Sequence, residues 1–156
     1  MTFQPYPRPV RDVHQIELTT RCQLRCHYCP HYPNLPREKV DMEWETFHQA
    51  LKVVAHFVAQ GTQTELSLTG IGESLLHPNF IPMVELARKT IGPRRMLTIT
   101  TNGLLLDEEM CKALQPFRPS VFVSLHRPEK AGLAVELAKK YGILAGINNA
   151  FATSAF

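Results

Sequence analysis

Segments typical of β-strands alternate with segments typical of α-helices along almost the whole chain, and this order limits the possible folds more than any other feature. The strand-like segments are residues 14–20, 64–70, 96–103, 121–126 and 143–151. Between them, apolar residues recur every three or four positions, as they do on one face of a helix. This order predicts about five βα units, a parallel sheet and an α/β fold.

Residues that favour helix starts precede three of the helix-like segments. Asp41 precedes the segment that stops at Gly61, and Asp107 precedes the shorter one that ends near Leu114, so we expect each aspartate to be the N-cap of its helix. His77 stands before the helix-like segment in between. We interpret it as a helix-entry residue rather than as a ligand.

Length and charge set the domain organisation and exclude some partners. The 156 residues suit one domain, residues 1–156. Because the last strand-like segment would leave an open sheet edge, we expect that a C-terminal strand and any further domain are missing.

The net charge of +3 is too small to indicate nucleic-acid binding, and no apolar run reaches the roughly 18 residues of a membrane span. Without an apolar leader, the chain is expected in the cytoplasm, where thiols stay reduced.

Glycines and unusual polar residues gather where the predicted strands end. Three cysteines follow the first strand, and the later strand ends carry Gly70, Gly72, Glu73, Asn102, Ser124, His126 and Asn149. In a parallel β/α sheet or barrel the C-terminal ends of the strands share one face, and binding sites are built there. We therefore predict that these residues, although far apart in the sequence, belong to one site.

Three of the four cysteines lie within eight residues, in the pattern C-x3-C-x2-C: Cys22, Cys26 and Cys29. Soft thiolate ligands favour zinc or an iron–sulfur cluster. A structural zinc ion would need a fourth ligand, for which His27 and His31 are available. A [4Fe–4S] cluster held by three cysteines would instead leave one iron open. Cys111 is interpreted as a small buried apolar residue rather than a ligand of a second cluster.

With this cysteine spacing the chain resembles the radical S-adenosylmethionine (radical SAM) superfamily, from about residue 13 to residue 150. The resemblance implies a partial (β/α) barrel, with Tyr28 lying against the adenine of S-adenosylmethionine. The second motif of the family fits Gly72 and Glu73, which follow Gly70, although Ser74 replaces the usual proline. It implies that Gly72 allows close approach of the methionine part and that Glu73 accepts hydrogen bonds from its ammonium group.

Later segments extend the resemblance. Ser124 and His126 are similar to the strand end that contacts the ribose hydroxyls or the methionine carboxylate, and Asn149 stands where an acidic residue is usual. Asn102 is interpreted either as a turn residue or as a cofactor contact. Residues 66–78 are most similar to members that modify peptides or proteins and carry an additional C-terminal cluster domain.

The resemblance also implies an activity. One electron from the reduced cluster would cleave S-adenosylmethionine to methionine and a 5′-deoxyadenosyl radical, which abstracts hydrogen from a substrate such as a peptide. An electron donor such as flavodoxin or ferredoxin would supply the electron. Two alternatives stay open: a cofactor-binding partner subunit without turnover, suggested by the departures at Ser74 and Asn149, and a structural zinc-binding module.

Overall fold

The computed structural model of the chain describes residues 11–26, 29, 38–125 and 128–148. The elements, in chain order, are α1 (Trp44–Ala59), β1 (Glu65–Ser67), the 3-10 helix η1 (Ser74–Leu76), α2 (Phe80–Ile91), β2 (Met96–Thr101), α3 (Glu108–Leu114), the 3-10 helix η2 (Gln115–Phe117), β3 (Ser120–Ser124), α4 (Pro128–Lys140) and β4 (Leu144–Asn148). Strands and helices thus alternate as the sequence predicts.

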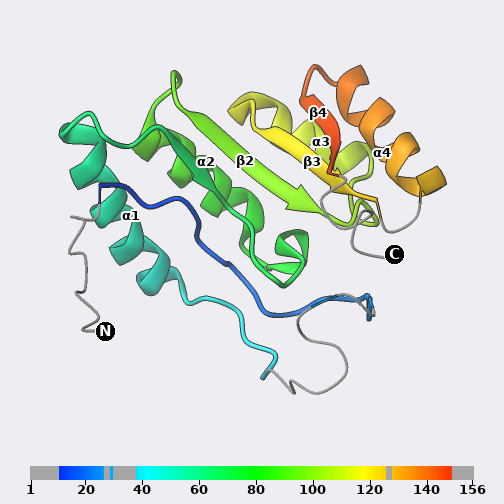
Figure 1. The fold of residues 1–156 in the computed structure, drawn as a ribbon, viewed down its shortest axis with the longest axis horizontal. Helices are drawn as coiled ribbons and strands as arrows, with labels where there is room; N and C mark the ends of the chain where they lie inside the picture. The colour runs from blue at the N-terminus through cyan, green and yellow to red at the C-terminus, as the bar shows by residue number, and fades with distance from the viewer. Residues whose placement is uncertain (1–10, 27–28, 30–37, 126–127, 149–156) are drawn as a thin grey trace, which may run out of the picture.

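The strands form one parallel sheet in the order β1-β2-β3-β4. Each crossover moves one strand further in the same direction, and Figure 1 shows α2 and α3 lying behind β2 and β3. Because all strands run the same way, their C-terminal ends meet at one edge. The predicted α/β fold with a parallel sheet is confirmed.

The first predicted strand, residues 14–20, is only partly correct. This segment makes one parallel bridge, between Gln15 and Ser67. The backbone of Ser67 accepts a hydrogen bond from Ile16 and donates one to His14, the two residues that flank Gln15. Farther along it turns to residues 40–42 instead, where Thr19 forms an antiparallel bridge with Asp41. Since β1 has only three residues, a longer ladder finds no partner there. The alternation of apolar residues still identified the inward face, because Leu18 is fully buried.

One of the two predicted helix caps is wrong. Asp107 is the N-cap of α3, and its carboxylate accepts a hydrogen bond of 2.8 Å from the backbone N–H of Met110. The N-cap of α1 is Glu43, which makes no side-chain capping bond, and not Asp41. The carboxylate of Asp41 is held by residues on the N-terminal side of the cysteines, as described below.

The core lies between the sheet and the helices. The predicted apolar face of α1 is buried, and Cys111 of α3 is fully buried among core residues, as expected for a small apolar side chain. None of the described helices combines the length and the hydropathy that a membrane span requires. In Figure 1 the segment that carries the cysteines (blue) extends beyond the C-terminal ends of the strands, near the arrowhead of β2.

Candidate functional site

The three cysteines of the segment are at least partly exposed to solvent. Cys22 is exposed, and Cys26 and Cys29 are half-buried. The backbone N–H of Leu24 donates to the sulfur of Cys22 over 3.4 Å, and the N–H of Cys29 donates to the carbonyl of Cys26 over 2.9 Å. Of the predicted cofactor-binding residues, Tyr28, His126 and Asn149 lie outside the described residues.

The pKa of the Cys22 thiol depends on its burial and on nearby charge. Partial desolvation raises the pKa of the Cys22 thiol, and the hydrogen bond from Leu24 opposes this. Charge on Glu73, Cys26 and Cys29 raises the same pKa further. A bound metal centre would instead lower the pKa of the Cys22 thiol, because its positive charge favours the thiolate, which is the form that binds metals.

No three histidine, cysteine or carboxylate side chains in the described part of the chain converge on a point where a single metal ion would bind. The two candidate fourth zinc ligands, His27 and His31, lie outside the described residues. A [4Fe–4S] cluster places each thiolate on a different iron, so it does not need three sulfurs around one atom.

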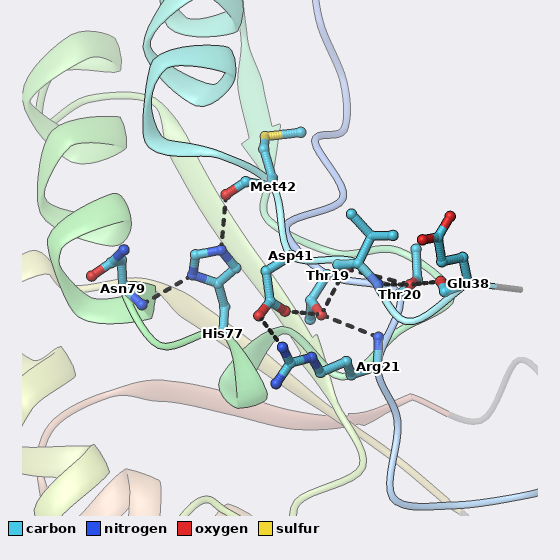
Figure 2. Close-up of polar contacts among 9 residues, drawn as sticks. Thr19, Thr20, Arg21, Glu38, Asp41, Met42, His77 and Asn79 are labelled. Carbon is cyan, nitrogen blue, oxygen red and sulfur yellow. Dashed lines mark hydrogen bonds and ion pairs between the residues drawn. The ribbon is translucent and has the colours of Figure 1, made fainter.

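The two chain segments that flank the cysteines are joined by a set of polar contacts that sequence reasoning missed (Figure 2). Thr19 Oγ1 donates to Asp41 Oδ1 over 2.6 Å, and Arg21 forms an ion pair of 2.7 Å with Asp41 Oδ2. Thr20 Oγ1 donates to the carbonyl of Glu38 over 2.6 Å. The only sequence signal was the polar run directly before Cys22. These contacts hold residues 19–21, before the cysteines, next to residues 38–41, after them.

His77 braces the same region from the side of the sheet, which agrees with its predicted role at a helix entry. Its Nδ1 accepts a hydrogen bond of 3.0 Å from the backbone N–H of Asn79, at the start of α2 (Figure 2). The proton is therefore on Nε2, which donates to the carbonyl of Met42 over 3.1 Å. His77 is thus buried and structurally occupied.

The loop after β1 packs directly against the segment before the cysteines, and Gly72 permits that contact. A Cβ at Gly72 would lie 2.0 Å from the carbonyl oxygen of Thr19 and 2.9 Å from that of Arg21. The next backbone N–H, of Glu73, donates to the Arg21 carbonyl over 2.7 Å. The close approach that Gly72 allows in this structure is therefore to the chain's own backbone.

Gly70 has a similar role, because a Cβ there would lie 2.2 Å from the side chain of Glu17. The carboxylate of Glu17 accepts hydrogen bonds from the N–H groups of Ile71 (2.7 Å) and Gly72 (3.1 Å). Ser74 replaces the proline expected from the resemblance, but its buried hydroxyl donates to the carbonyl of Leu68 over 2.9 Å. This bond restrains the loop where proline would have done so through its ring.

Glu73 connects the loop after β1 to the end of β2. Its carboxylate is buried and accepts hydrogen bonds from the hydroxyl of Thr101 (2.8 Å) and from the backbone N–H groups of Asn102 (2.7 Å) and Leu75 (3.3 Å). Burial raises the pKa of Glu73, and these three bonds partly oppose the shift. The carboxylate of Glu73 thus holds the loop after β1 and the end of β2 together, and its contact with the ammonium group of a ligand stays a prediction.

Because burial raises the pKa of Glu73 in the folded state, the stability of the protein is expected to depend on pH through this residue. As the pH rises above about 4.3, glutamate ionises in the unfolded chain before it ionises in the fold. Its contribution to stability is therefore complete at low pH and is lost as the pH rises, by at most about 1.4 kcal/mol per pH unit. Chemical denaturation at several pH values should show the unfolding free energy of the parent falling relative to Glu73→Gln. A constant difference between the two proteins would contradict this reading.

Asn102 and Ser124 lie at the ends of neighbouring strands, as predicted. The side-chain Nδ2 of Asn102 lies 4.0 Å from the sulfur of Cys22, so the end of β2 meets the cysteine segment. Ser124, the buried last residue of β3, is in register with Asn148 of β4. The structure therefore brings Cys22, Glu73 and Asn102 together, and places Ser124 at the same edge of the sheet.

Comparisons with known proteins agree with this geometry. The sequence model of the Radical SAM superfamily matches residues 16–142. A GTP 3',8-cyclase of Synechocystis sp. is 33% identical over 110 residues, covering 67% of this chain and 30% of that protein. A tungsten-containing aldehyde ferredoxin oxidoreductase cofactor-modifying protein of Pyrococcus furiosus is 36% identical over 104 residues, covering 64% and 26%.

Solved structures share the fold. BtrN in complex with AdoMet and 2-DOIA superposes with a TM-score of 0.70 at 20% identity, over 92% of this chain and 59% of that one. Native anSMEcpe with bound AdoMet gives a TM-score of 0.68 at 25% identity, over 86% and 43%. The chain spans less than half the length of the curated relatives it matches. The family model matches most of the chain and the parallel sheet has the same fold as these structures, so this chain belongs to the radical SAM superfamily.

Proposed function

We propose that this chain is the core of a radical SAM enzyme that holds a [4Fe–4S] cluster on Cys22, Cys26 and Cys29 and S-adenosylmethionine at the adjoining strand ends. The observation that carries the proposal is that the sulfur of Cys22 lies 4.0 Å from the side-chain amide of Asn102 at the C-terminal edge of the parallel sheet, where the backbone of Asn102 also binds Glu73. The assignment of residues 1–156 to one radical SAM core remains a prediction.

The residues present fit such a cluster. Thiolates are the donors that iron–sulfur clusters use, and three of them lie in one short segment. The N–H of Leu24 already points at the sulfur of Cys22, as donors do around ligated thiolates. The cysteine segment has no fourth cysteine, so this segment would leave one of the four irons without a cysteine ligand.

When bound, the cluster and S-adenosylmethionine supply reductive cleavage of a sulfonium C–S bond, which yields methionine and a 5′-deoxyadenosyl radical able to abstract hydrogen. The protein's own residues would position these groups and exclude water. Glu73 would hold the ends of β1 and β2 in register and accept hydrogen bonds from the ligand's ammonium group. Ser124, Tyr28, His126 and Asn149 would contact the remainder of the ligand, with Tyr28 against the adenine.

Partner and substrate are proposed more broadly. The reaction needs one electron from outside, which we assign to a donor of the flavodoxin or ferredoxin type. Arg25 and Lys39 are exposed beside the cysteine segment and could meet the acidic surface of such a donor. A peptide or protein substrate is proposed from the sequence of residues 66–78 alone, which is most similar to family members that modify peptides or proteins. A cytoplasmic location is proposed because the thiols must stay reduced.

One assay separates the proposed activity from the two alternatives. The protein would be reconstituted with iron and sulfide without oxygen, reduced with dithionite and supplied with S-adenosylmethionine, and 5′-deoxyadenosine would be measured by chromatography. We expect 5′-deoxyadenosine in the presence of the cluster and none without it. An intact cluster without product would favour the partner subunit, whereas purified protein that binds zinc and takes up neither iron nor sulfide would favour the zinc module.

A further inference from the structure

The side chain of Asn102 is aimed at a cysteine rather than at open space. Its Oδ1 accepts a hydrogen bond of 3.0 Å from the backbone N–H of Leu104 and lies 3.5 Å from Nε2 of Gln23, which also donates to it. Two donors on one atom identify that atom as the amide oxygen, so the other end of the amide is the NH2 group. This NH2 group lies 4.0 Å from the sulfur of Cys22.

The position of Asn102 is determined by the fold. Its backbone N–H donates to Glu73 over 2.7 Å, and the residue is 8% exposed. The bond to Leu104 closes a local turn that fixes the side-chain rotamer. The amide therefore cannot turn away from Cys22 without losing a hydrogen bond. It would already have this orientation when a cluster binds.

We propose that Asn102 is a positioning residue that donates to the thiolate of Cys22 and thereby raises the reduction potential of the cluster. This inference rests on the proposed function, since it requires the cluster on the three cysteines. A hydrogen bond to a ligand sulfur withdraws electron density from it and favours the reduced, more negative cluster. The backbone N–H of Leu24 also donates to this sulfur, but Asn102 is the donor that a substitution can remove.

Two substitutions separate this role from a purely structural one. Asn102→Ala removes both the donor and the bond to Leu104. Asn102→Asp keeps an oxygen for Leu104 but replaces the donor by a negative charge near the sulfur. We expect the midpoint potential of the cluster to shift to more negative values in Asn102→Ala and further in Asn102→Asp, although the aspartate disturbs the local backbone less.

The measurement is a redox titration of the reconstituted chain, followed by electron paramagnetic resonance in the absence of S-adenosylmethionine, so that ligand binding does not contribute. Asn79→Ala is the matched control, because Asn79 is exposed and its side chain makes no capping bond. It is expected to keep the potential of the parent.

The outcomes distinguish this inference from the function on which it rests. A parent protein that assembles no cluster would defeat the proposed function itself. A parent that holds the cluster, with both Asn102 variants at the parent's potential, would overturn only the role of Asn102. Loss of the cluster from both variants with an unchanged circular dichroism spectrum would also overturn it, and would make Asn102 an anchor of the cysteine segment.

Discussion

Replacing Cys26 by alanine is expected to abolish retention of the iron–sulfur cluster while leaving the fold largely intact. Cys26 is half-buried, and the hydrogen bond it makes with Cys29 uses its backbone carbonyl, which alanine preserves. The cluster, however, would lose one of its three protein ligands, which leaves a second iron without a thiolate from this segment. Iron and sulfide content after anaerobic reconstitution measures the first effect, and circular dichroism the second.

Cys111→Ala provides the matched control for this experiment. Cys111 is fully buried in α3, and within the described part of the chain its surroundings are core residues. We expect this variant to hold as much iron and sulfide as the parent. Equal cluster content in Cys26→Ala and the parent would contradict the ligand assignment, and cluster loss in Cys111→Ala would show that the assay reports stability instead of ligation.

Gly72→Ala is expected to have the largest effect on folding. The added Cβ would lie 2.0 Å from the carbonyl oxygen of Thr19 and 2.9 Å from that of Arg21, and both oxygens are backbone atoms that cannot rotate away. The loop after β1 must therefore separate from the segment before the cysteines, which also breaks the bond from Glu73 N–H to the Arg21 carbonyl. We expect a loss of about 3 kcal/mol or more in unfolding free energy, measured by chemical denaturation.

Gly132→Ala is the control for the general effect of adding a methyl group. Gly132 lies within α4, and no atom lies within 4 Å of the Cβ it would carry. This variant is expected to gain roughly 0.5–1 kcal/mol, because alanine loses less conformational entropy in a helix. A Gly72→Ala protein as stable as the parent would mean that the loop can move aside at little cost.

The contacts around Asp41 explain why one prediction from the sequence was wrong. An aspartate three residues before a helix is a natural capping candidate, and Asp107 fulfils that role in α3. Asp41 has instead a hydroxyl at 2.6 Å and a guanidinium at 2.7 Å, both from residues some twenty positions earlier. A charged partner outweighs a backbone N–H as a hydrogen-bond donor, and its presence depends on the fold.

The strand predicted for residues 14–20 is only partly correct for a related reason. The alternation of apolar residues correctly indicated which side chains are buried, since burial depends on local periodicity. A regular ladder also needs a neighbour of matching length, and β1 ends at Ser67. The remaining part of the segment pairs with residues 40–42, which the order of elements along the chain does not reveal.

By itself, the sequence determined the alternation of strands and helices, and it predicted the edge of the sheet and the three thiols of the candidate site. These follow from periodicity and residue chemistry, which act over a few positions. Only the tertiary structure decided that Gly72 faces the Thr19 carbonyl, that Glu73 joins the ends of β1 and β2, and that the amide of Asn102 faces Cys22. Asn102 and Cys22 are 80 positions apart, and such contacts depend on how the strands stack rather than on any local pattern.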